Sequence, residues 1–174
     1  GTIVTIFDKA LPTPNEVHSF MLDSLGTGVC ASGHGDPIVL WDRYAERWML
    51  SEFSQSGNNL CVYISQTSDP VAGGWYNYGY TAPSFPDYPK YGVWPTDAGG
   101  GLGSYVVTAN DGNNGVYMLD RGAMLGGSPG TYTVQVSNKG SLQNGPQAFS
   151  LIVSAVSRPP VGTNLVIDED FSGG

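Results

Sequence analysis

The sequence predicts an all-β fold in which an antiparallel meander sheet packs in a sandwich. Two observations predict it. The chain combines 25 glycines and 12 prolines with only 13% charged residues, and its apolar residues recur in short runs between turn-forming residues. Many short strands joined by tight turns have this composition, whereas helices are rich in Glu and Lys. With 40% hydrophobic residues, the 174-residue chain can bury a core.

The first half of the chain contains six predicted strands. The segment 2–7 is rich in β-formers, and Pro12 and Pro14 follow it. Trp48, Leu50 and Glu52 share one face of a later strand, which predicts a half-buried strand. Four consecutive strands with short loops form a meander, the unit of a β-propeller blade. The six strands are expected at residues 2–7, within 17–25, and at 37–41, 47–53, 60–65 and 75–80.

The second half begins with a proline-rich, aromatic segment at 83–95, which we expect to be an edge strand or an ordered loop. A hairpin is predicted around the turn at 110–115, and further strands at 131–137, 149–156 and 164–168. The glycine-rich segment 126–130 divides two regions. Residues 1–127 would form the blade-like sheet with the N-terminal strand. Residues 128–174 would add a hairpin that completes the sandwich, a C-terminal strand and a tail, unless 1–174 is one domain.

Charge and hydropathy exclude two classes of partner. The net charge is −8 and only 7 Lys and Arg are present, so we expect no binding to nucleic acid. No apolar run reaches about 18 residues, so we expect no membrane insertion.

The sequence shows no signal peptide, and we expect that processing removed it or that the chain is a fragment of a longer protein. The acidity is typical of a soluble extracellular protein.

The two cysteines, Cys30 and Cys61, each lie beside a strand-like segment. A disulfide between them would stabilise the fold by about 3–4 kcal/mol through loop entropy. The alternative is a pair of buried free thiols, because cysteine packs as a small hydrophobe. The composition favours the disulfide and a secreted protein.

Two parts of the chain resemble known families. The strings GDPIVLWD (35–42), RWMLSEF (47–53), FPDYPKYGVWP (85–95) and NGVYMLDR (114–121) resemble the opening blade of a family of secreted bacterial β-propeller-like proteins, over residues 20–127. Residues 130–157 are similar to the last strands of jelly-roll domains appended to secreted subtilisin-like proteases. The final DEDFSGG resembles the start of an adhesin-type domain. These resemblances imply an extracellular accessory protein and transfer no catalytic residue. A closed propeller also needs at least about four blades.

No motif in the sequence indicates catalysis or a cofactor. His34 lies in a glycine-rich loop without an orienting carboxylate beside it, and we expect His18 and His34 to be ordinary surface residues. Paired carboxylates for glycoside hydrolysis could be drawn from Asp36, Asp42, Glu46 and Glu52, but hairpin surfaces carry such charges routinely. The loop 111–115 partly resembles a calcium loop but lacks its bidentate Glu, so the hairpin interpretation is preferred and no metal is expected. We therefore predict a protein that is not an enzyme.

Aromatic residues form the most prominent cluster. Flat rings with polar edges stack on sugars and anchor protein interfaces, and alternate rings also pack cores. The candidate binding residues are Trp75, Tyr76, Tyr78, Tyr88, Tyr91 and Trp94. We predict a structural or adhesive module that self-assembles into filaments through its terminal strands, 2–7 and 164–168. The alternatives are a polysaccharide-binding module that uses segment 75–94 and an accessory domain of a secreted hydrolase.

Overall fold

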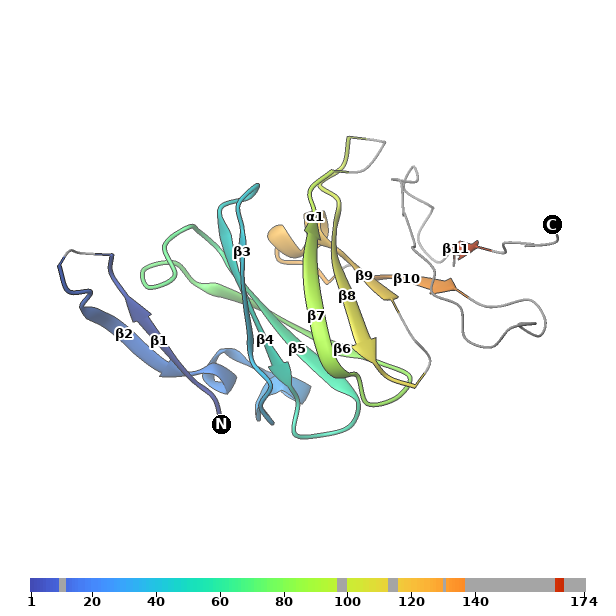
Figure 1. The fold of residues 1–174 in the computed structure, drawn as a ribbon, viewed down its shortest axis with the longest axis horizontal. Coiled ribbons are helices and arrows are strands. Elements are labelled where there is room, and N and C mark those ends of the chain that lie inside the picture. Colours follow the sequence, from blue (N-terminus) through green and yellow to red (C-terminus); the bar gives the residue numbers. More distant parts are fainter. Residues whose placement is uncertain (10–11, 97–99, 113–115, 130, 137–164, 168–174) are drawn as a thin grey trace.

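The computed structural model describes residues 1–9, 12–96, 100–112, 116–129, 131–136 and 165–167, and it consists mainly of β-sheet (Figure 1). The all-β prediction is confirmed. A two-stranded sheet contains β1 (Ile3–Phe7) and β2 (Glu16–Met21). A four-stranded sheet contains β3 (Ile38–Asp42), β4 (Arg47–Phe53), β5 (Asn59–Ser65) and β6 (Trp75–Thr81). A five-stranded sheet contains β7 (Asp87–Trp94), β8 (Ser104–Asn110), β9 (Val116–Asp120), β10 (Thr131–Val136) and β11 (Leu165–Ile167).

The four-stranded sheet is the predicted meander. Its strands follow one another in the order β3-β4-β5-β6, and every neighbouring pair is antiparallel. The connection between β3 and β4 is a tight turn in which Glu46 adopts a left-handed φ of 54°. Trp41 lies directly opposite Trp48, so the hairpin aligns the two indole rings at 4.8 Å between centroids.

The five-stranded sheet has the order β11-β10-β9-β8-β7. Its pairs from β7 to β10 are antiparallel, whereas β10 and β11 run parallel, the one exception to the predicted pattern among the described strands. The proline-rich segment forms the edge strand β7, as expected, because proline cannot donate to a second neighbour. β10 pairs with β9 in the same sheet. A domain boundary between residues 127 and 128 would therefore separate strands of one sheet. The strand predicted at 149–156 lies outside the described residues.

The two larger sheets pack face to face around the main core. Alternate residues of β4 and β5 point into it, including Met49, Val62 and Ile64, and all three are almost completely buried. Tyr105, Val107 and Leu119 meet them from β8 and β9. The helix α1 (Arg121–Leu125) contributes Met124 to the same cluster.

The opposite face of the four-stranded sheet is covered as well, which corrects the prediction of a half-buried strand at 47–53. Two 3₁₀ segments, η1 (Leu22–Leu25) and η2 (Gly28–Cys30), supply Leu22 and Cys30 to a second cluster with Leu50, Cys61 and Tyr63. Every residue of β5 is therefore buried. The sequence pattern missed this layer because η1 and η2 are too short to show a periodicity.

The N-terminal hairpin of β1 and β2 lies outside the two stacked sheets, at one end of the molecule (Figure 1). The strand expected within 17–25 ends at Met21, where the chain turns into η1. The hairpin contacts the body through one face only. Val4 and Phe20 pack against the second cluster, and the Phe20 ring lies 6.5 Å from that of Trp75.

Candidate functional site

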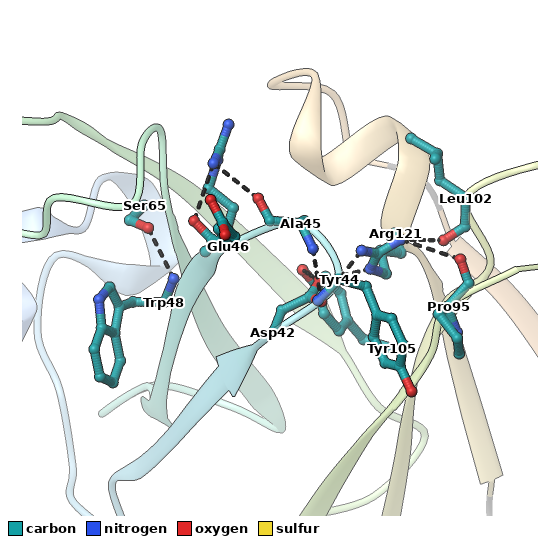
Figure 2. Close-up of polar contacts among 11 residues, drawn as sticks. Asp42, Tyr44, Ala45, Glu46, Trp48, Ser65, Pro95, Leu102, Tyr105 and Arg121 are labelled. Carbon is teal, nitrogen blue, oxygen red and sulfur yellow. Dashed lines mark hydrogen bonds and ion pairs between the residues drawn. The ribbon is translucent and has the colours of Figure 1, made fainter.

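Asp42, a buried acid at the end of β3, lies at the centre of a polar cluster (Figure 2). Asp42 begins the turn between β3 and β4, and its Oδ1 accepts hydrogen bonds from the backbone N–H groups of Tyr44 (3.0 Å) and Ala45 (3.2 Å). Aspartate is favoured at this position because its short side chain can bond the backbone two residues on. Its Oδ2 accepts from the Arg121 Nε at 2.6 Å and from the Tyr105 hydroxyl at 2.8 Å.

Arg121 reaches this acid from the first turn of α1. Asp120 caps the helix by accepting from the Ala123 N–H at 2.9 Å, which sets the start of α1 and places Arg121 there. The guanidinium Nη2 donates to Asp42 Oδ1 at 3.2 Å. Nη1 donates to the carbonyl oxygens of Leu102 (2.5 Å) and Pro95 (3.3 Å). The arginine thus joins the two large sheets and the loop between β7 and β8.

Hydrogen bonds keep the buried Asp42 carboxylate ionised. Burial alone would raise the pKa of Asp42, but the hydrogen bonds from Arg121 and Tyr105 outweigh it, so the pKa lies below its ordinary value. Burial and the Asp42 charge raise the pKa of the Tyr105 phenol, which stays a donor. Asp42 is 0% exposed and Arg121 2% exposed. These groups already bind one another out of solvent, so we interpret the cluster as a clamp between sheets.

A second buried acid lies on the other face of the same sheet. Glu52 is 1% exposed, its Oε1 accepts from the Tyr63 hydroxyl at 3.3 Å, and its Oε2 has no hydrogen-bond partner. The carboxylate packs against Gly33, where any Cβ would collide with it. Burial raises the pKa of Glu52 and the nearby Asp23 carboxylate adds to the effect, while the Tyr63 hydrogen bond partly offsets it.

The four carboxylates considered for glycoside hydrolysis do not converge. Asp42 faces the five-stranded sheet through Tyr105, whereas Glu52 faces the N-terminal layer through Tyr63. Asp36 is exposed and Glu46 lies in the turn between β3 and β4. Asp42 and Glu52 lie on opposite faces of a sheet and cannot flank one glycosidic bond, and the Asp42 carboxylate is already bound by Arg121 and Tyr105.

The six candidate aromatic residues are distributed over three places. Tyr76, Tyr78 and Tyr91 pack in or against the main core, and the Tyr78 hydroxyl donates to the Met124 carbonyl at 2.6 Å. Trp75 lies on the opposite face of the sheet, and its indole N–H donates to the Pro70 carbonyl at 3.3 Å. The structure does not bring these four together on one surface.

The other two candidate rings remain exposed on β7. Tyr88 is 68% and Trp94 43% exposed, and the Lys90 ammonium lies 3.9 Å from the centre of the Tyr88 ring. An exposed ring that the aromatic cluster did not include is Trp41, 39% exposed beside Trp48. The sequence could have indicated this pair of rings, because Trp41 and Trp48 flank the same predicted hairpin turn.

The predicted disulfide is confirmed. Cys30 and Cys61 are bonded with their Cα atoms 5.6 Å apart, and both are fully buried. The bond links Cys30 in η2 covalently to Cys61 in β5, which is one of the two inner strands of the four-stranded sheet. Gly79 allows this close approach, because a Cβ there would lie 2.6 Å from the Val29 side chain.

The described part of the chain holds no group of three or more His, Cys, Asp or Glu side chains arranged to bind a metal. The His18 ring in β2 lies against the Phe20 ring. The backbone N–H of His34 donates a hydrogen bond to the Phe53 carbonyl oxygen. Of the calcium-like loop 111–115, Asp111 accepts a hydrogen bond from the Tyr117 hydroxyl, and 113–115 lie outside the described residues.

No helix in the described residues is long and apolar enough to cross a membrane. Comparison of the chain with protein-family models, with curated proteins and with solved structures finds no match.

Proposed function

We propose that this chain is a structural, adhesive module of the extracellular space that assembles with copies of itself by β-strand addition. The observation that carries the proposal is the N-terminal hairpin. Among the described residues, β1 pairs with β2 alone, and the hairpin exposes Ile3 (68%), Phe7 (54%) and Met21 (40%).

The register places these exposed residues on one face. Ile3 lies opposite Met21, and Thr5 lies opposite Ser19, with their hydroxyl groups 3.3 Å apart. The other face, with Val4 and Phe20, packs on the body. A two-stranded sheet is marginally stable in water, and its outer edges leave N–H and C=O groups unpaired. A further strand along an edge of the hairpin would pair these groups, and its side chains would extend the apolar face.

Two further features support a structural role outside the cell. A buried disulfide forms and persists in oxidising compartments, and secreted proteins use it to stabilise their folds. The buried charges of the Asp42 clamp bind one another, and neither partner is left exposed to act on a substrate. Both features fit a load-bearing module.

The experiment compares the full chain with variants of the exposed hairpin face, using light scattering and negative-stain microscopy. We expect the full chain to form polymers at high concentration. Ile3→Lys with Phe7→Lys should stay monomeric with an unchanged melting temperature, because both side chains are exposed. Val71→Lys, at a residue 42% exposed in a loop, is the matched control and should polymerise. A monomeric full chain, or a double variant that polymerises normally, would refute the proposal.

A second candidate function is carbohydrate binding by β7, favoured by the exposure of the Tyr88 and Trp94 rings. A glycan array decides it. A glycan signal that is lost in Tyr88→Ala and in Trp94→Ala would support this function. An array without any signal would exclude it.

A further inference from the structure

The strand edges of the two large sheets differ in how well they are protected. Among the described residues, the outermost strands are β3 and β6 in one sheet and β7 and β11 in the other. An unprotected edge presents a row of unpaired backbone groups to any other strand. Proteins block such edges with proline, lysine, bulges or covering segments. An edge that lacks these devices is open to strand addition.

The edge of β7 carries several of these devices. Pro89 has no N–H to donate, and the register with β8 shifts between Asp87 and Lys90. Tyr88 adopts a left-handed φ of 55°, which breaks the extended backbone. Lys90 adds a charge at the same point. A partner strand could not pair regularly along this edge.

Neighbouring segments flank β6. The backbone N–H and the hydroxyl of Thr27, just before η2, both donate to the Asn77 side-chain oxygen at 3.1 and 3.0 Å. On the other face, Tyr78 bonds the Met124 carbonyl of α1, and Gly127 lies against the ring of Tyr76. Segments therefore pack on both faces of β6 and leave little room for the side chains of an added strand.

β3 has none of these features. Its five residues pair with β4 in unbroken register, and the strand Ile38–Asp42 contains no proline, glycine or lysine. Within the described part of the chain its only hydrogen-bonded neighbour strand is β4. Its outward side chains are large and apolar, with Val39 61% and Trp41 39% exposed. β3 is thus a regular and uncovered edge.

We infer that β3 is the acceptor edge for β1 of a second copy of this chain. The inference rests on the proposed function and names the surface that completes it. Both strands are five residues long, and β1 contains no charge or proline. In antiparallel orientation the exposed Lys9, which follows β1, lies toward the exposed Asp36, which precedes β3. This arrangement pairs opposite charges at one end of the added strand.

The geometry of this contact determines the kind of assembly. The donor β1 and the acceptor β3 are different surfaces of the same chain, so the contact is head-to-tail and leaves a free donor at one end and a free acceptor at the other. Each addition extends a four-stranded sheet by the two strands of the neighbour's hairpin. The product is a filament unless the rotation between copies closes a ring.

The test uses an acceptor variant and a donor variant of the full chain. Val39→Lys places a charge on the β3 edge at an exposed position. Trp94→Lys is the matched control on the β7 edge, 43% exposed. The donor variant is Ile3→Lys with Phe7→Lys. We expect Val39→Lys to be monomeric and Trp94→Lys to polymerise. Val39→Lys mixed with the donor variant should give a one-to-one dimer that grows no further.

The outcomes separate this inference from the proposed function. Normal polymers from Val39→Lys, together with a monomeric donor variant, would overturn β3 as the acceptor and leave self-assembly standing. A monomeric full chain would overturn both. A charge exchange tests the orientation, because Lys9→Glu and Asp36→Lys should each weaken assembly about tenfold or less, as expected of an exposed pair, and their combination should restore it. If the combination weakens assembly further, the antiparallel contact is wrong.

Discussion

Replacing Asp42 by Asn tests whether the buried clamp holds the two large sheets together. In the native chain, Asp42 accepts from Arg121 through both of its oxygens and from Tyr105 through Oδ2. Asparagine keeps one acceptor oxygen and presents an NH₂ group to a guanidinium that can only donate. Arg121 would then be a buried cation, 2% exposed, without a counter-charge.

The expected cost follows from this geometry. Removing one partner of a buried ion pair destabilises a fold by about 3–5 kcal/mol, because the remaining charge is left uncompensated. The carbonyl groups of Leu102 and Pro95 still accept from Arg121 and keep the loss toward the lower end of this range. Asp42→Leu combined with Arg121→Met removes both charges. This double variant should cost less than Asp42→Asn, since an apolar pair is often as stable as a buried ion pair.

Chemical denaturation at neutral pH measures these differences, with Asp36→Asn as the exposed control that should change stability little. A loss below about 1 kcal/mol for Asp42→Asn would refute the reasoning, because a buried unpaired charge costs more. The pH profile gives a second check. The pKa of Asp42 is lowered in the fold, so its contribution is present above about pH 3.8 and is lost as pH falls through the lower folded value. Asp42→Asn should remove this part of the acid sensitivity.

Two further predictions concern the N-terminal layer. Replacing Cys30 and Cys61 by Ala should lower the free energy of unfolding by about 2–4 kcal/mol, and denaturation with and without reductant measures it; an unchanged midpoint would contradict a stabilising disulfide. Glu52→Gln should flatten the pH profile. The pKa of Glu52 is raised in the fold, so stability falls as pH rises from about 4.5 through the folded value, and Gln keeps the acceptor for Tyr63 without the charge. An equally steep decline in the variant would show that Glu52 does not cause it.

Local patterns predicted the strands because each strand has a signature that depends only on its own residues. Alternating and β-branched residues, with turn formers between them, indicated the meander of β3 to β6 and the edge position of β7. The parallel pairing of β10 with β11 was not predicted, since the two strands are separated by 28 residues and no local signal encodes which distant strands meet.

The polar contacts were harder to predict for the same reason. Asp42 and Arg121 are 79 residues apart, and each resembles an ordinary charge beside a turn in the sequence. The aromatic cluster at 75–94 was visible, but strand alternation distributes its members to opposite faces of β6 and to β7. Clustering in sequence therefore did not place the six rings on one surface. The disulfide was predictable because a chain with two cysteines allows one intramolecular pairing.

The anchoring of the hairpin and of β3 fits the proposed assembly. Tension on β1 passes along β2 and η1 to η2, where the Cys30–Cys61 bond transfers it to β5 inside the four-stranded sheet. Tension on β3 meets the Asp42–Arg121 pair, which ties the end of β3 to α1 and the second sheet. An edge strand held only by its own hydrogen bonds would peel away one bond after another. A covalent bond anchors η2, which follows the hairpin in the chain, and a buried ion pair anchors the end of β3. In the proposed assembly we therefore expect two copies to separate at the strand contact before either one unfolds.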